Sequence, residues 1–242
     1  MNPHDPKDVG LIAQMGADTE VQLTARRLFD MSCRYRYSYN FSWMGRPVIQ
    51  YPQDLVAMQE VLWRVQPDLI VETGVAHGGS LVFYASILEL IGKPAKVLGI
   101  DIEIRPHNRT AIESHPMAKR IQLIEGSSVS ETVAAQVRAE AAQAKRVLVV
   151  LDSNHSHSHV LKELELYAPL VKTGSYVAVF DTVVEDMDPS LVGDRPWGRG
   201  DNAKTAVHAF LKSCDRFEID HEIDRKLLLT VAPDGYLRCI KD

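Results

Sequence analysis

The sequence contains few of the features that mark secreted, membrane-embedded or nucleic-acid-binding proteins. Only three of the 242 residues are cysteines, and none of them forms a CxxC pair. This excludes a disulfide framework and favours a reducing compartment, the cytoplasm. No apolar run approaches the roughly 18 residues that a membrane span needs, and the polar start MNPHDPKDVG does not resemble a signal peptide. The net charge of −5 gives no basic surface for nucleic acid.

The bulk composition is that of an ordinary globular domain. Hydrophobic residues make up 45% of the chain and charged residues 24%, and the length suits one α/β domain with a full core. Residues 1–18 are expected to form a loose arm, and Thr19–Tyr35 shows helical spacing of its apolar residues. The aromatic stretch Arg34–Pro52 is expected to be an ordered loop that covers another part of the protein. A helix should follow between Pro52 and Pro67.

From Asp68 onward, apolar strand-like runs alternate with amphipathic helices. Such a pattern predicts a parallel sheet that is covered by helices on both faces. The expected strands are 68–73, 96–101, 120–125, 146–152 and 175–181. The expected helices are 78–92, 109–118, 130–144, 159–172 and 202–213. Near the C-terminus, RFEIDHEI and KLLLTVAP are expected to form a closing hairpin at the edge of the sheet.

Ligands of an open parallel sheet bind at the carboxyl ends of the strands, so the residues that follow each strand are the candidates for a site. The first strand runs into VETGVAHGGS, which contains Glu72 and a glycine-rich turn. Glycines allow close approach to a ligand, although a tight strand–helix turn alone would also need them. Asp101 ends the second strand and could accept the two hydroxyls of a ribose, or cap a loop. Ser127 and Ser128 follow the third strand and could face an adenine ring or belong to a helix cap.

The fourth and fifth strands end in Asp152 and Asp181, which adjacent strands would place at one rim. Two carboxylates this close are costly unless a cation lies between them, and oxygen ligands favour Mg²⁺, Ca²⁺ or Mn²⁺. His155, His157 and His159 follow at alternate positions, whose side chains point apart, so they are not expected to share one zinc ion. Of the three, His155 is the candidate general base, because histidine titrates near neutral pH.

Four segments together resemble the cephalosporin hydroxylase/rhamnosyl O-methyltransferase family. They are ETGVAHGGS, LDSNHSHSHVLKELELYAPLVKTGSY, the following FDT, and RPWGRGDNAKTAVHAFL. The resemblance covers roughly residues 47–211. It implies a Rossmann-like, doubly wound, seven-stranded α/β sheet, mostly parallel with an antiparallel C-terminal strand, and an S-adenosylmethionine-dependent O-methyltransferase. It also implies a homo-oligomer, in which residues 1–52 contribute to the assembly and substrate pocket while residues 53–242 form the methyltransferase domain.

The resemblance assigns roles to individual residues. The cofactor set comprises Glu72, Gly74, His77, Gly78, Gly79, Ser80, Asp101, Ser127, Ser128 and Asp152. A Mg²⁺ site falls on Asp152 and Asp181, with Asp152 or His155 as the catalytic base. The family's glutamate before the second aspartate is replaced by Phe180, so that Thr182, Asn154 or water would have to fill the gap.

The expected reaction is methyl transfer to a hydroxyl of a small molecule, a sugar or a secondary metabolite, with no nucleic acid or membrane as partner. The aromatic loop Tyr35–Tyr51 and the segment Val184–Asp201 are expected to cover the pocket. Two alternatives remain at this point: a metal-dependent hydroxylase, and a catalytically inert cofactor-binding homologue, which the loss of the glutamate at Phe180 favours.

Overall fold

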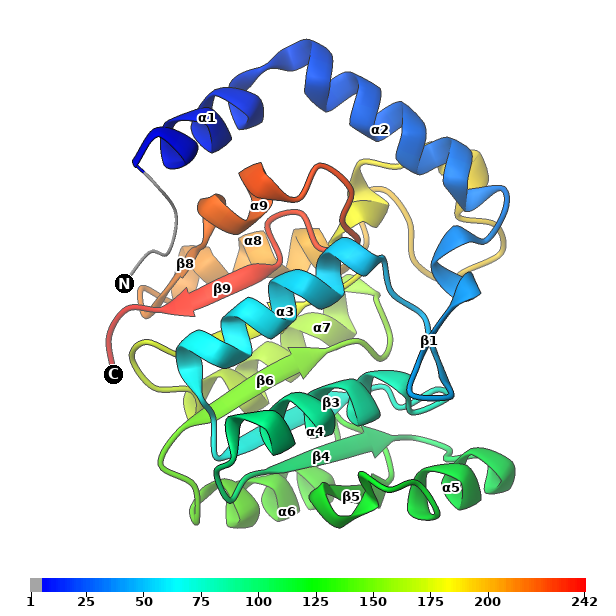
Figure 1. Cartoon of the computed structure of the whole chain (residues 1–242), viewed down its shortest axis with the longest axis vertical. Helices are drawn as coiled ribbons and strands as arrows, with labels where there is room; N and C mark the ends of the chain where they lie inside the picture. The colour runs from blue at the N-terminus through cyan, green and yellow to red at the C-terminus, as the bar shows by residue number, and fades with distance from the viewer. Residues whose placement is uncertain (1–5) are drawn as a thin grey trace.

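The computed structural model describes residues 6–242, and a twisted sheet of seven strands forms its centre (Figure 1). The strand order is β5-β4-β3-β6-β7-β9-β8. From β3, the strands β4 and β5 follow to one side of the sheet, whereas β6 and β7 follow to the other. Ligands of such sheets bind at this switch point between β3 and β6. The strands are β3 (Leu69–Thr73), β4 (Lys96–Asp101), β5 (Ile121–Glu125), β6 (Val147–Leu151), β7 (Tyr176–Val179), β8 (Phe217–Ile219) and β9 (Tyr236–Cys239).

The five strands predicted from apolar runs all exist and pair in parallel. β3 pairs with β4 on one side and β6 on the other, with Thr73 opposite both Ile100 and Leu151. Every residue of β3 and β6 is buried, because helices cover both faces and a Val/Leu/Ile strand can then bury both sets of side chains. This register brings the carboxyl ends of the central strands to one edge.

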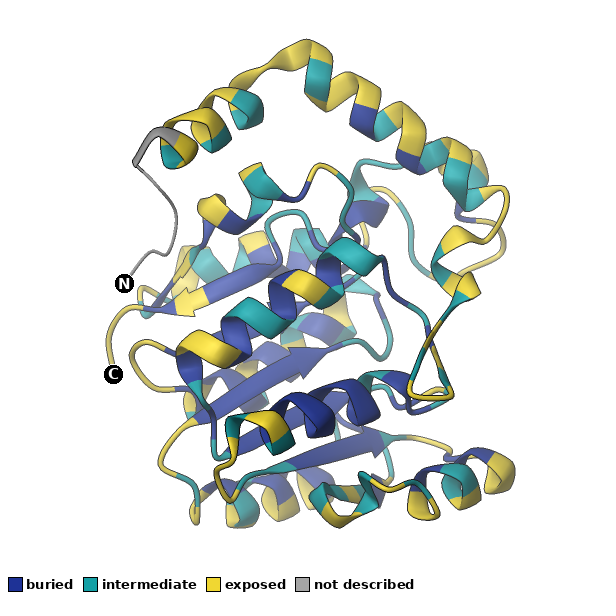
Figure 2. Cartoon of the chain, viewed as in Figure 1, coloured by how far each residue is buried: buried dark blue, intermediate teal, exposed yellow. Residues whose placement is uncertain are grey.

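Two helical layers enclose the sheet (Figure 2). One face packs against α3 (Pro52–Val65), α4 (Gly79–Ile91) and α9 (His221–Lys226). The other packs against α6 (Glu131–Ala141), α7 (His157–Tyr167) and α8 (Ala203–Ser213). The remaining helix of this region, α5 (Pro106–Glu113), begins three residues before the predicted start, because Pro106 at its first turn fits a helix start and needs no intrahelical donor.

The N-terminal region is more ordered than the sequence pattern indicated. The prediction of a loose arm over residues 1–18 is wrong for its described part, which forms α1 (Pro6–Ala17); residues 1–5 lie outside the described residues. Asp18 then caps α2 (Thr19–Cys33), accepting from the backbone amide of Glu20 at 3.0 Å. Both helices lie across the top of the molecule in Figure 1.

The aromatic stretch after α2 folds into a small ordered unit, as predicted. It contains a 3₁₀ turn, η1 (Tyr37–Asn40), and a two-stranded antiparallel ribbon of β1 (Phe41–Trp43) and β2 (Arg46–Val48). Trp43 fixes the ribbon to α4, because its indole N–H donates to the Ser86 hydroxyl at 2.9 Å. The ribbon therefore holds the following residues, Ile49–Tyr51, in one place at the edge of the sheet.

The predicted C-terminal antiparallel pair lies at the edge of the sheet as expected, but its second strand is wrong. RFEIDHEI gives β8 but continues into α9, and KLLLTVAP forms no strand. Buried Asp54 on α3 holds that segment by accepting from the Thr230 hydroxyl and, at 2.9 Å, from the Val231 amide. The true partner, β9, inserts between β7 and β8 and runs antiparallel to both. Across residues 6–242, no helix is both long and apolar enough to cross a membrane.

Candidate functional site

A cavity of about 630 Å³ opens at the carboxyl ends of β3, β6 and β7. The end of α2, the aromatic stretch 36–51 and the segment 183–197 form its outer wall. The predicted site residues that line it are Gly74, His77, Gly79, Ser80, Asp152, His155 and Asp181. Apolar and aromatic walls with a few converging polar groups are typical of a small-molecule site.

The glycine turn after β3 is shaped by close backbone packing. Gly74 has φ +91°, and a Cβ there would lie 2.0 Å from the Asp152 carbonyl oxygen. A Cβ on Gly79 would lie 2.1 Å from the carbonyl oxygen of Pro47. The turn thus touches the chain after β6 on one side and the N-terminal ribbon on the other, so that three separate segments meet at the cavity floor.

Glu72 lies beneath the turn and is fully buried. It accepts a hydrogen bond from the Ser80 hydroxyl at 2.8 Å, while its second carboxyl oxygen has no partner among the described residues. Burial raises the pKa of Glu72 to about 8. The side chain does not itself line the cavity, and neither does Gly78, whose φ of +77° begins α4.

The predicted ribose and adenine groups also lie outside the cavity wall. Asp101 accepts from the backbone amides of Val75 and Ala76, at 2.8 and 3.2 Å, and so supports the glycine turn. The Ser128 hydroxyl lies 3.1 Å from His159 Nε2. The alternative prediction, a helix cap, is found two residues after Ser128, where the Ser130 side chain caps α6. Asp101 therefore adjoins the turn that lines the cavity, whereas Ser127 and Ser128 are not among the lining residues.

Asp152 and Asp181 both face the cavity, as adjacent strand ends predict. Burial and the nearby Asp181 carboxylate raise the pKa of Asp152 well above its usual range. Asp181 has φ +55°, a left-handed conformation that is uncommon outside glycine but tolerated by aspartate. Such strained backbone concentrates at functional sites. The left-handed conformation of Asp181 sets the direction of its carboxylate just after β7 ends.

The three alternate histidines contact three different surroundings, as their spacing predicts. His155 is buried, with Nε2 3.2 Å from Asp181 Oδ2 and its ring 5.0 Å from Trp197 in an edge-to-face arrangement. His157 lies 2.8 Å from the Thr205 hydroxyl on α8. His159 lies between the hydroxyls of Ser128 and Ser153. Among them, His155 alone lines the cavity.

The position of the replaced glutamate faces the core. Phe180 is buried and packs edge-to-face on Tyr236, with ring centroids 6.4 Å apart. The two proposed substitutes are already in use: the Thr182 hydroxyl donates to the Pro233 carbonyl, and the Asn154 side-chain oxygen accepts from Ser156. Neither residue is among those that line the cavity, whereas the two aspartates are.

The sequence profile of the family described as Rhamnosyl O-methyltransferase/CmcI matches residues 35–240. The chain belongs to this family. A rhamnosyl O-methyltransferase of Mycobacterium tuberculosis is 32% identical over 201 residues, which are 81% of this chain and 77% of the relative. One of Mycobacterium leprae is 33% identical over 201 residues, 81% and 82% respectively. The chain is accordingly an S-adenosylmethionine-dependent O-methyltransferase by class.

Solved structures support the fold of this O-methyltransferase. An apo structure of CmcI superposes with a TM-score of 0.60 at 19% identity, covering 84% of this chain and 78% of the other. A CmcI structure with Mg and SAM gives 0.57 at 19% identity, covering 84% and 77%. MycE in complex with Mg, SAH and mycinamycin VI gives 0.52 at 18%, covering 88% of this chain and 54% of that one.

Several residues of the O-methyltransferase line the cavity without having been predicted individually. Gln50, Tyr51 and Trp197 contribute polar and aromatic surface, and Arg36 and Arg195 also line the cavity. The concentration of aromatic residues in 35–51 marked the segment. No pattern marked Gln50, because its significance depends on the ribbon that places it beside Asp152.

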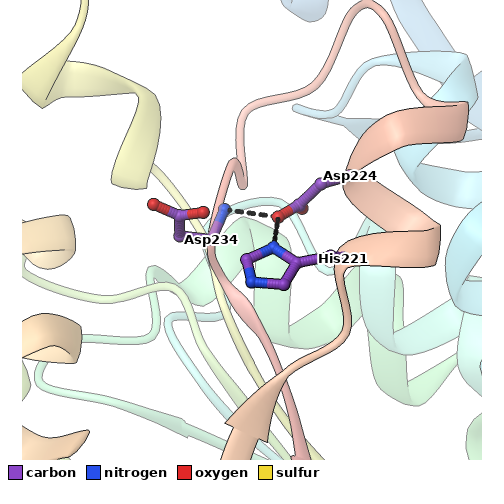
Figure 3. Close-up of side chains that lie close together, drawn as sticks. All are labelled: His221, Asp224 and Asp234. Carbon is purple, nitrogen blue, oxygen red and sulfur yellow. Dashed lines mark hydrogen bonds and ion pairs between the residues drawn. The ribbon is translucent and has the colours of Figure 1, made fainter. Parts of the chain in front are cut away.

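A second cluster, His221, Asp224 and Asp234, has the residue types of a metal site (Figure 3). Most of its groups have partners within the protein, although Asp224 Oδ1 is buried without one among the described residues. One Asp224 carboxyl oxygen accepts from the Asp234 backbone amide at 3.1 Å, and the Asp234 carboxylate pairs with Lys204 and His208 at 3.3 and 3.1 Å. These hydrogen bonds and ion pairs join α9 and α8 to the turn before β9.

Proposed function

We propose that this chain transfers a methyl group from S-adenosylmethionine to a hydroxyl of a sugar or secondary metabolite, assisted by Mg²⁺. The observation that carries the proposal is the convergence of the glycine turn, Asp152, His155 and Asp181 on one cavity. The structural neighbours named with Mg, SAM and SAH have the same fold, and the curated relatives named as rhamnosyl O-methyltransferases suggest a sugar acceptor.

The cavity suits the proposed donor and cation. Asp152 and Asp181 are the two residues that would hold Mg²⁺. Burial and the nearby Asp181 carboxylate raise the pKa of Asp152, and a cation between the two would relieve their charge repulsion. Their carboxylate oxygens are the ligands that Mg²⁺ prefers. The turn from Gly74 to Ser80 would accommodate the donor, with Glu72 beneath it. When bound, the cation would orient the acceptor oxygen and lower its pKa, and the donor would supply an electrophilic methyl group.

The chain's own contribution to the reaction is alignment and proton transfer. The acceptor oxygen would bond to the methyl carbon as the carbon–sulfur bond breaks, and His155 would take the hydroxyl proton on Nδ1, since Asp181 faces Nε2. Asp181, 3.2 Å from Nε2, would orient the ring and stabilise its charged form. Trp197 packs against the ring edge and would limit access of water.

Calorimetric titration of S-adenosylmethionine into the purified protein, with Mg²⁺ and then with chelator, tests the proposal. We expect micromolar binding, and methyl transfer to a sugar acceptor such as a methyl rhamnoside that falls when the cation is removed. Cofactor binding without turnover on a broad acceptor panel would instead favour an inert homologue. Absence of binding in both conditions would reject the methyltransferase proposal altogether.

Replacing His155 with glutamine should lower kcat about 10²- to 10³-fold, because general-base catalysis contributes that much. The dissociation constant for S-adenosylhomocysteine should stay unchanged. His208→Gln is the matched control, since His208 is exposed and contacts Asp234 far from the cavity wall. Wild-type turnover in His155→Gln would assign the proton to another acceptor, with Asp152 the next candidate.

We further propose that residues 1–52 serve substrate binding and self-association, and that the protein is a cytoplasmic homo-oligomer. Phe29 and Cys33 of α2 already line the cavity. The same helix leaves Leu23 66% and Leu28 51% exposed, and a second copy would bury these side chains. All three cysteines are free, which suits a reducing compartment. Light scattering should give a multiple of 27.1 kDa; a mass of one chain would contradict the oligomer.

A further inference from the structure

Among the described residues, two side chains on the wall of the cavity have a buried polar atom without a partner: the acceptor oxygen of Gln50 and the indole N–H of Trp197. Gln50 is 3% exposed and lies between the ribbon strand β2 and the first residue of α3. Its amide N–H donates to Asp152 Oδ2 at 3.1 Å, whereas its amide oxygen is buried and has no donor among the described residues. An unpaired buried carbonyl is unfavourable, so a ligand that supplies an N–H would be preferred there.

The position of Gln50 is fixed from both sides. Pro47, three residues earlier, packs its backbone against Gly79 so closely that no Cβ fits between them. The Tyr51 hydroxyl, one residue later, shares a hydrogen bond with Ser32 of α2. These contacts hold the backbone around Gln50, while burial and the hydrogen bond to Asp152 hold its amide.

The surroundings favour a cationic donor. Asp152 and Asp181 place carboxyl groups on this wall of the cavity, and Glu72 lies beneath the glycine turn, where it accepts from Ser80. The donor runs along the glycine turn, and by the general rule for such sheets its ribose end belongs on the β4 side, at Asp101. Its other end then points toward β6, where the turn touches the Asp152 backbone. That end carries an α-ammonium group.

We infer that Gln50 is a cofactor-positioning residue, whose amide oxygen accepts a hydrogen bond from the α-ammonium of S-adenosylmethionine while its N–H holds Asp152. This inference rests on the proposed function. It assigns to the N-terminal segment a contact with the donor in addition to its contacts with the acceptor. This contact would also explain why the loop before α3 is ordered, since the other proposed donor contacts come from residues at the ends of the sheet strands.

Calorimetry with two ligands tests this assignment. The first is S-adenosylhomocysteine, and the second is S-adenosyl-4-thiobutyrate, which lacks only the amino group. Gln50→Leu should weaken binding of the first about 10-fold or more, because hydrogen bonds to charged groups are strong, and should leave binding of the second unchanged. Gln50→Glu keeps the acceptor oxygen and should retain the preference for the amine.

Gln53→Leu is the matched control. Gln53 is three residues away and also has a buried amide oxygen without a partner, but it does not line the cavity. The Gln53→Leu variant should bind both ligands as tightly as the wild type does. Equal weakening of both ligands in Gln50→Leu would show that Gln50 only shapes the cavity. Weaker Mn²⁺ binding with unchanged S-adenosylhomocysteine binding would make it a metal ligand instead. Either result overturns the assignment, whereas failure of the wild type to bind S-adenosylhomocysteine rejects the proposed function itself.

Discussion

Asp152→Asn should lower methyl transfer about 10²- to 10⁴-fold, because the proposed cation ligand and a candidate base are lost in one substitution. The cavity should survive, since asparagine has nearly the same shape and its side-chain oxygen can still accept from Gln50. Binding of S-adenosylhomocysteine should persist within a few-fold. Turnover close to that of the wild type would remove Asp152 from both proposed roles.

The same substitution should make the ligand-free protein more stable at neutral pH. The pKa of Asp152 is raised by folding, so the carboxyl keeps its proton more readily in the folded state than in the unfolded chain, where its pKa is about 3.9. The free energy of unfolding therefore falls as pH rises from about 4 toward the folded-state pKa. Asparagine does not titrate and escapes this loss.

Thermal unfolding of both proteins between pH 4 and 8, in chelator, measures this effect. The advantage of Asp152→Asn should grow with pH. Asp188→Asn serves as the control, because hydrogen bonds from Ser190 hold the pKa of exposed Asp188 below its usual range, so this substitution should show no such gain. A variant that is less stable than wild type at pH 8 would mean that the Asp152 carboxylate is stabilised where it lies.

Gly74→Ala should cost about 2–5 kcal/mol of stability and abolish donor binding. The added Cβ would lie 2.0 Å from the Asp152 carbonyl oxygen, at a backbone φ of +91° that alanine disfavours. Both backbone segments belong to the cavity floor, so neither can move without displacing Asp152. Chemical denaturation and calorimetry with S-adenosylhomocysteine would measure the two effects.

Gly92→Ala separates the two causes of that loss. Gly92 also has a positive φ, of +77°, but nothing lies within 4 Å of the added Cβ. It ends α4 far from the cavity wall, so alanine there should cost only about 1–2 kcal/mol and leave donor binding intact. Equal effects at Gly74 and Gly92 would show that conformational preference alone matters and that the contact with Asp152 does not.

The sequence was most informative where local pattern and final structure depend on the same property. Continuous Val/Ile/Leu runs such as 147–151 predicted buried parallel strands, because burial on both faces requires that composition. KLLLTVAP has the same apolar character but is held by Asp54 from α3, a contact across 176 residues that no local pattern reports. α1 was missed because its first residues are polar and rich in proline.

Prediction of the candidate site was limited in a similar way. Asp152, His155 and Asp181 follow strand ends, and strand order alone brings them to one edge. Asp101 also lies at a strand end, but its carboxylate accepts from the amides of the glycine turn. Its position at a strand end did not predict these hydrogen bonds. Gln50 depends on the fold of the ribbon. The division at residue 52 and the individual cofactor contacts remain predictions.

The insertion of β9 between β7 and β8 has a consequence for the order in which the chain can fold. β9 is synthesised after β7 and β8, yet among the described residues β8 contacts the sheet only through it. Until Tyr236–Cys239 are available, β7 therefore presents an open hydrogen-bonding edge and β8 has no neighbour in the sheet. Exposed edges of this kind favour pairing with other chains. Tyr236–Cys239 thus close the edge of β7 and join β8 to the sheet once they are made.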